Sequence, residues 1–185
     1  MIKYSHKEDL IMKYMIASDI HGSAKYCKML LDSYKKENCS RLFLLGDTLY
    51  HGPRNGLPDE HDPMLVSEML NEYKNEISGV RGNCDCEIDQ MLLQFPIMAD
   101  YALIPLKTKT VFLTHGHLFN KDQLPPINSG DVLIHGHTHV TADEILPEGI
   151  RLLNPGSVSF PKCGTGRGYI ILDTETEEFT WKSIL

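Results

Sequence analysis

The sequence has little that would suit a disulfide-rich or membrane-spanning protein. Its cysteines number five and form no paired framework, which favours reduced thiols and a cytoplasmic location. No apolar run approaches the length of a membrane span, and the first residues lack the apolar stretch of a secretory signal. We therefore expect no membrane partner.

Positive charge is also scarce, because 18 lysines and arginines face 25 aspartates and glutamates, for a formal net charge of -7. A protein that binds a nucleic-acid polymer through its phosphates is normally basic, so we expect no such partner. An acidic chain that handles phosphate groups needs local positive charge from arginine, lysine or a metal ion.

The composition is that of an ordinary globular chain, with 185 residues, 42% of them hydrophobic and 23% charged. Met12 directly precedes the first strand-like segment. We therefore expect an N-terminal extension at 1–11 and a single domain at 12–185.

Apolar runs and helical spacing alternate in the first half of the chain. Strands are predicted at 13–19, 41–47 and 77–83, and helices at 23–37, after Pro63 and at 87–93. The second half is mainly strand, with two strands in 101–117, one at 131–137, and hairpins at 142–154 and 168–184. This pattern predicts an α/β fold with a sheet-on-sheet core flanked by helices.

Polar side chains follow one apolar run after another, each beside a glycine that lets the backbone turn sharply. In α/β sheets, ligands bind outside the carboxyl ends of strands, so these side chains are expected to converge on one edge. They are Asp19, His21, Asp47, Asn83, His115, His137 and His139.

This set combines two carboxylates, four imidazoles and one amide, without a thiolate. Such nitrogen and oxygen donors suit Mn, Fe, Zn, Ni or Co better than Ca or Mg. Seven side chains exceed what one ion uses, so two ions that share a carboxylate are the more economical arrangement. Two such ions are the standard device for phosphoryl hydrolysis, and their charge would attract an anionic phosphoryl group.

The motifs D-x-H, G-D, G-N-x-D, H-G-H and G-H-T-H occur in this order between about Met12 and Ser159. They resemble those of the calcineurin-like metallophosphoesterases, and "HGPRN", "RGNCD", "THGHLF" and "NPGSVS" are similar to the small bacterial YfcE-type phosphodiesterases. The resemblance implies a four-layer α/β/β/α sandwich. It also implies a metal-dependent phosphodiesterase that hydrolyses small phosphate diesters, with two divalent ions, manganese first and zinc, iron, nickel or cobalt as alternatives.

The resemblance further implies how the ligands divide. Asp19, His21 and His139 would bind one ion, Asp47 would bridge, and the other ion would take Asn83, His115 and His137. A hydroxide between the ions would attack phosphorus in line, since metal binding lowers the pKa of water to about 7. His135, within the predicted strand, is expected to be structural.

Cys84 departs from the family, whose common pattern is G-N-H-D with a histidine that helps to protonate the leaving oxygen. The thiol could donate a proton or could simply fill space. His51, shortly after Asp47, is a second candidate acid, with an exposed loop histidine as the alternative. Arg54 is predicted to hold a non-bridging phosphate oxygen, and a solvated surface arginine is the alternative.

Three further residues near the motifs have weaker predictions. Arg81 is expected to pair with a carboxylate, and His117 to support the metal shell or touch the substrate. Asp85 would normally orient the missing histidine, so its role is open. The turn 154–157 is expected to hold the loop near His139.

Two other functions compete with the phosphodiesterase. One is a non-catalytic protein-binding scaffold, since a subunit of the retromer coat resembles this fold. The other is a phosphomonoesterase or protein phosphatase. A scaffold is free to lose ligands, whereas every predicted ligand position is filled here. Family resemblance is also compatible with a homo-oligomer.

Overall fold

The computed structural model describes residues 12–184, so the predicted N-terminal extension lies outside the described part. The first half alternates strand and helix: β1 (Lys13–Ala17), α1 (Ala24–Glu37), β2 (Arg41–Leu44), α2 (Pro63–Asn71), β3 (Ile77–Gly79) and α3 (Glu87–Leu92). The second half is β4 (Tyr101–Pro105), β5 (Thr110–Thr114), β6 (Val132–His135), β7 (Ala142–Ile145), β8 (Arg151–Asn154), β9 (Gly168–Asp173) and β10 (Glu178–Ser183). Every predicted strand and helix is thus confirmed, with ends that differ by a few residues.

The helices begin where local sequence signals predict them. Ser23 precedes α1, and its hydroxyl accepts a hydrogen bond from the backbone N–H of Tyr26. Asp62 caps α2 in the same way, with Pro63 in the first turn. The apolar side of α1 faces the core, because Leu30 and the residues at helical spacing around it are buried.

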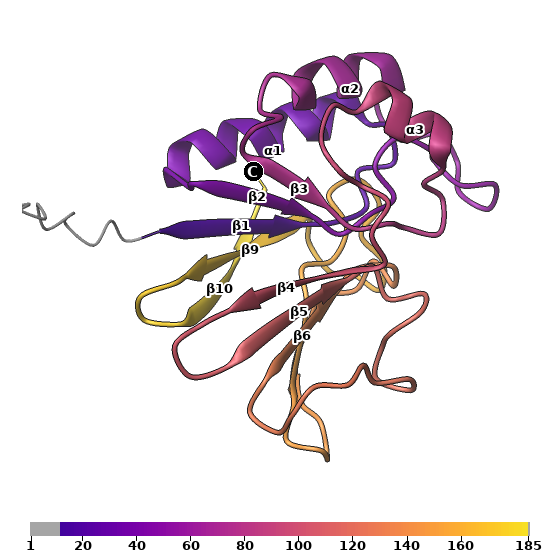
Figure 1. The fold of residues 1–185 in the computed structure, drawn as a ribbon. Helices are drawn as coiled ribbons and strands as arrows, with labels where there is room; N and C mark the ends of the chain where they lie inside the picture. Colours follow the sequence, from indigo (N-terminus) through magenta and orange to yellow (C-terminus); the bar gives the residue numbers. More distant parts are fainter. Residues whose placement is uncertain (1–11, 185) are drawn as a thin grey trace, which may run out of the picture.

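Two five-stranded mixed sheets form the centre of the molecule, with strand orders β10-β9-β1-β2-β3 and β4-β5-β6-β8-β7. β1, β2 and β3 are parallel to one another, as are β5, β6 and β8. The loops that follow β1, β2, β5 and β6 gather at one end of the sandwich, on the right of Figure 1. This end is where the predicted ligands were expected.

The layers follow from where apolar side chains point. Ile16 and Leu45 of the first sheet pack against Leu113 and Ile134 of the second. The three helices of the described residues all cover the other face of the first sheet (Figure 1). The α/β class and the two-sheet sandwich are therefore confirmed.

The outer face of the second sheet is covered differently. Its cover comes from the chain between β5 and β6, which contains no helix and places Phe119, Leu124 and Ile127 against the sheet. The fourth layer here is irregular chain.

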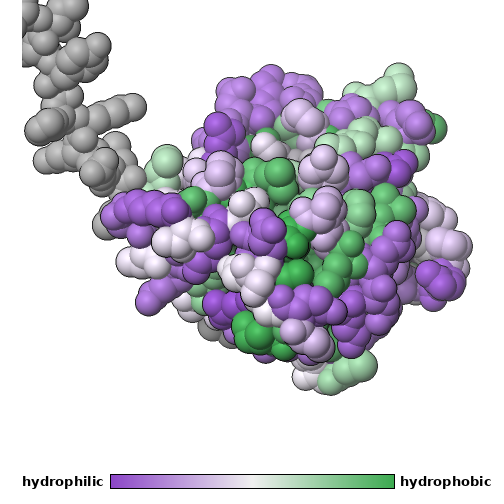
Figure 2. Space-filling view, turned by 60° about the horizontal axis from the view of Figure 1, so that its bottom comes forward, coloured by the Kyte–Doolittle hydropathy of each residue, from purple (hydrophilic) through white to green (hydrophobic). Residues whose placement is uncertain are grey.

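Figure 2 shows a face on which apolar side chains form patches between polar ones. Large apolar residues are also exposed on the edge strand β4, where Tyr101 and Leu103 are 49% and 53% exposed. That the protein forms a homo-oligomer stays a prediction.

Within residues 12–184, no helix has the length and apolar character needed to cross a membrane.

Candidate metal centre

The loops that carry the predicted ligands have an unusual backbone. Five of these ligands have a left-handed φ although none is glycine: Asp19 (60°), His21 (50°), Asp47 (52°), His137 (65°) and His139 (61°). Such a conformation costs a non-glycine residue on the order of 1–3 kcal/mol and persists only where the surroundings impose it. The loops after β1, β2 and β6 therefore fix these side chains at the expense of local backbone energy.

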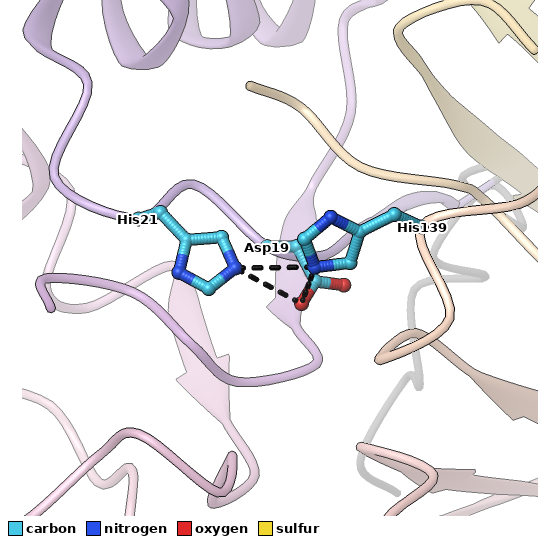
Figure 3. Close-up of side chains that lie close together, drawn as sticks. All are labelled: Asp19, His21 and His139. Carbon is cyan, nitrogen blue, oxygen red and sulfur yellow. Dashed lines mark hydrogen bonds and ion pairs between the residues drawn. The ribbon is translucent and has the colours of Figure 1, made fainter. Parts of the chain in front are cut away.

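Asp19, His21 and His139, which we call the first half-site, converge from two loops far apart in the sequence (Figure 3). His139 Nε2 lies 3.2 Å from Asp19 Oδ1 and 3.2 Å from His21 Nε2, and His21 Nε2 lies 3.5 Å from the same carboxylate oxygen. All three side chains are buried. These contacts place three donor atoms around one point.

The imidazole tautomers can be assigned from the hydrogen bonds on the far side of each ring. His21 Nδ1 donates to the backbone oxygen of Tyr50, and His139 Nδ1 to that of Phe160, each at 2.8 Å. Because a carbonyl oxygen can only accept, the neutral rings leave unprotonated Nε2 atoms facing each other. Asp19 Oδ1 between them has no hydrogen-bond partner. Facing lone pairs repel unless a cation lies between them, so the donor set fits a metal ion.

Asn83, His115 and His137, the second half-site, repeat this arrangement. His115 Nδ1 donates to the backbone oxygen of Leu45 at 2.7 Å, which directs its Nε2 inward. That Nε2 lies 3.0 Å from Asn83 Oδ1 and 3.2 Å from His137 Nδ1. With the His115 ring neutral, its Nε2 and Asn83 Oδ1 present lone pairs to the same point, which fits a second cation.

Asp47 lies between the half-sites. Its Oδ2 is 3.8 Å from His21 Nε2 and 3.5 Å from His115 Nε2. Its Oδ1 accepts a hydrogen bond from the backbone N–H of Cys84 at 2.8 Å. The geometry thus offers one carboxylate to both half-sites.

Asp85 has a role that sequence reasoning left open. Its carboxylate accepts three backbone hydrogen bonds, from Gly82 at 2.7 Å and from Asp47 and Thr48 at 2.9 Å each. It therefore ties the loop after β2 to the loop after β3. Gly82 must be glycine, because a Cβ there would collide with Asp47 Oδ1.

The turn after β8 supports the first half-site through hydrogen bonds to the backbone of the loops that carry its ligands. Ser157 and Ser159 donate their hydroxyls to the backbone oxygen of Asp19, at 2.8 and 3.1 Å. Asn154 Nδ2 donates to the backbone oxygen of Gly136 at 2.9 Å and to Thr138 Oγ1 at 3.0 Å. The expectation that this turn holds the loop near His139 is confirmed.

The pKa values in the metal-free protein follow from burial and from the facing charges. Burial alone would raise the pKa of Asp19, but the close approach of the His139 and His21 rings outweighs it and holds the pKa well below the usual value. Burial would lower the pKa of His115, yet the Asp47 carboxylate raises it to about 9. Burial, with the nearby negative charge of Asp47, raises the pKa of Cys84 to about 12. The carboxylate is therefore charged at neutral pH, and the thiol keeps its proton.

A cleft of about 830 Å³ opens over both half-sites. Besides five of the predicted ligands, its lining includes Cys84 and Arg54, as expected for residues near a substrate. Cleft residues that the sequence did not reveal are Tyr50, Asn55, Thr138 and Lys162. No motif marks Lys162, which reaches the cleft only because the chain folds back after β8.

His51 is not among the cleft-lining residues. Its ring packs against those of Tyr50 and His61, with centroids 4.7 and 5.3 Å away. The ring is thus held against its neighbours on the loop after β2, and the role of His51 as an acid stays a prediction.

The remaining predicted residues lie around the centre. Arg81 pairs with Asp100 at 2.8 Å, as expected. The ring of His117 lies 5.4 Å from that of His115, and its buried Nδ1 has no hydrogen-bond partner. His135 is buried, and its Nδ1 contacts the backbone oxygen of Gly136 at 3.0 Å, outside both half-sites.

Known proteins are similar to this chain over most of its length. A calcineurin-like phosphoesterase superfamily domain matches residues 12–177. Phosphodiesterase YfcE of Escherichia coli (strain K12) is 48% identical over 165 residues, which cover 89% of each chain. The probable metallophosphoesterase YsnB of Bacillus subtilis (strain 168) is 26% identical over 176 residues, or 91% of this chain and 88% of that one.

The fold was also compared with solved structures. That of YfcE, a phosphoesterase from E. coli, matches with a TM-score of 0.85 and 44% identity, and the match covers 94% of this chain and all of the other. A family match of this extent, together with these relatives, decides the assignment. The chain belongs to the calcineurin-like phosphoesterase superfamily.

Proposed function

We propose that this protein is a metal-dependent phosphodiesterase that hydrolyses small phosphate diesters with two divalent ions. The observation that carries the proposal is the pair of half-sites, in which imidazole nitrogens face oxygen donors around two neighbouring points. A relative that is 48% identical is named a phosphodiesterase, which supports the same reaction class.

The first half-site would hold one ion, the second half-site the other, and Asp47 would contact both. When bound, the ions would add positive charge at the phosphoryl group and lower the pKa of water to about 7, which supplies the nucleophile. Manganese is our expected metal, and the same donors also accept zinc, iron, nickel or cobalt.

The protein's own groups orient this chemistry. The hydrogen bonds from His21 Nδ1, His139 Nδ1 and His115 Nδ1 to backbone oxygens fix the rings, so that their other nitrogens point inward. Arg54, on the cleft wall, is suited to bind a non-bridging phosphate oxygen through its fork of donors.

Among the described residues that line the cleft, none is an efficient acid to protonate the leaving oxygen of the ester. The common family pattern has an imidazole at the position of Cys84, and a thiol is a weaker hydrogen-bond donor to a leaving oxygen. His51 lies outside the cleft lining. The enzyme should therefore prefer esters with good leaving groups, such as aryl diesters.

A protein-binding scaffold and a phosphomonoesterase are the competing functions. A scaffold gives no reason to keep left-handed backbone at five ligand positions. A monoesterase needs room for one substituent on the phosphate, whereas this cleft extends beyond the half-sites to Arg54 and Lys162.

The test is hydrolysis of a bis-aryl phosphate beside the matching aryl monophosphate. Protein stripped with chelator is restored with Mn, and Asp47→Asn is compared with Asp32→Asn, an exposed position on α1 that leaves both half-sites intact. We expect Mn-dependent diester hydrolysis that Asp47→Asn lowers on the order of a thousandfold and Asp32→Asn leaves unchanged.

Two results would contradict the proposal. Folded protein that hydrolyses neither ester with Mn, Ni, Co, Fe or Zn would favour the scaffold. A clear preference for the monoester would make the protein a phosphomonoesterase.

A further inference from the structure

The cleft is larger than the reacting phosphate group needs. Its volume of about 830 Å³ is in the range of pockets that enclose a whole small molecule. Asp47, a shared ligand in the proposed centre, is the only carboxylate among its lining residues. The outer part of the cleft is therefore lined by neutral groups and by the cations of Arg54 and Lys162.

These two cations share one cleft that holds no free carboxylate to pair with them. Elsewhere, Lys25 pairs with Asp59, Arg151 with Asp143, and Lys182 with Glu37. Among residues 12–184, neither Arg54 nor Lys162 forms an ion pair. Two unpaired cations in one cleft, on a chain with a net charge of -7, indicate an anionic ligand with more than one charged group.

The backbone at Lys162 is held beside the first half-site. Its N–H donates to the backbone oxygen of His139 at 2.9 Å, and its own carbonyl accepts from Thr165 Oγ1 at 2.8 Å. Arg54 comes from another loop, between β2 and α2. Lys162 is thus placed to contact a part of the substrate other than the one that Arg54 binds.

We propose that Lys162 determines substrate specificity by binding a second phosphate group, carried on one arm of the diester. The preferred substrates are then small phosphodiesters with an additional phosphate monoester, and simple diesters lack this contact. A lysine ammonium suits this task, because it binds phosphate as a compact charge with three rotatable donors. The inference rests on the proposed phosphodiesterase function.

The test uses two substrates with the same scissile bond. They are thymidine 5′-(4-nitrophenyl phosphate) and its 3′-phosphorylated derivative, each assayed for kcat and KM with the Mn-restored protein. We expect the 3′-phosphate to lower KM by about tenfold without changing kcat, as one charge-assisted contact would. Lys162→Gln should abolish this difference and Lys162→Arg should retain most of it. The matched control is Lys121→Gln, an exposed position that does not line the cleft.

The possible failures are distinguishable. Equal KM values for the two substrates with the unchanged protein overturn the inference but leave the proposed function standing. Loss of activity by the same factor on both substrates in Lys162→Gln also overturns it, since the lysine would then serve the scissile phosphate. Failure to hydrolyse either substrate with any of the metals overturns the proposed function together with the inference.

Discussion

The two half-sites of the metal centre are alike in geometry but differ in charge and burial. The first has a carboxylate of its own, and Asp19, His21 and His139 are only 0%, 1% and 3% exposed. The second has a neutral amide in that place, and Asn83 is exposed. A charged oxygen ligand binds a divalent ion more strongly than an amide does, and burial strengthens the attraction further. We infer that the first half-site binds its ion more tightly.

The supports of the half-sites differ as well. The first is held through the backbone oxygen of Asp19, which accepts hydroxyl hydrogen bonds from Ser157 and Ser159. The second depends on the charged side chain of Asp85, which binds the backbone N–H groups of Gly82 and Asp47. An ion in the first half-site would therefore be well enclosed, whereas an ion in the second would face the cleft and exchange more readily.

The largest effects that test the difference between the half-sites should come from removing one oxygen ligand at a time. Asp19→Asn should lower diester hydrolysis on the order of a thousandfold and release the first ion, because a buried charge is lost. Asn83→Ala should lower activity less and should leave one ion bound. Metal content after dialysis, measured beside kcat, distinguishes the two. If both variants retained the same number of ions, the half-sites would not differ as inferred.

A substitution beside the second half-site tests proton delivery. Cys84→His should raise the hydrolysis of diesters with alkyl leaving groups by about a hundredfold, because an imidazole can protonate the leaving oxygen. Aryl diesters should gain far less, since their leaving groups need no proton. The control is Cys86→His, an exposed neighbour that is not in the cleft lining. An equal gain for both kinds of ester would mean that position 84 acts in some other way.

The support of the second half-site can be weakened without touching a predicted ligand. In Asp85→Asn an amide NH₂ would face backbone N–H donors, so we expect a loss of about 10–100-fold in activity and in affinity for the second ion. Ser157→Ala, which removes one hydroxyl from the Asp19 carbonyl, should affect the first ion instead. Manganese titrations of both variants would show which ion each loses. Loss of the first ion before the second in Asp85→Asn would contradict the division, because Asp85 also positions the shared ligand Asp47.

The strands, the helices and the ends where polar residues gather could be predicted because each follows from a local pattern. An apolar run that ends in Gly-Asp or Gly-His indicates both a buried strand and the place where its polar neighbour emerges. Asn83 and His139 could therefore be grouped before their distance in space was known.

Features that depend on contacts distant in sequence could not be predicted. Lys162 enters the cleft only through the return of the chain after β8, and the ring of His51 packs on that of His61, ten residues further along the chain. The three hydrogen bonds of Asp85 depend on two loops that meet only in the folded chain. The pattern of residues within one segment carries no information about which distant segment it will contact in the folded chain.

The smallest expected effect concerns protons that occupy the centre when metal is absent. The Asp47 carboxylate raises the pKa of His115 from 6.5 to about 9, so the ring is charged at neutral pH in the metal-free protein. The stability from this charge is fully present below pH 6.5 and is lost as the pH rises through about 9. The thermal midpoint of the metal-free protein should therefore fall by a few degrees over this interval.

A metal ion in the second half-site must displace the proton of His115. Metal affinity at this half-site should therefore depend on pH. Binding of Mn near pH 7.5 should release a proton from His115, and affinity for the second ion should rise by up to tenfold per pH unit until about pH 9. The Asp19 carboxylate stays ionised throughout, because its pKa lies well below the usual value. Calorimetry in buffers of different ionisation enthalpy measures the protons released. If release persisted unchanged at pH 10, the protons would come from a group other than His115.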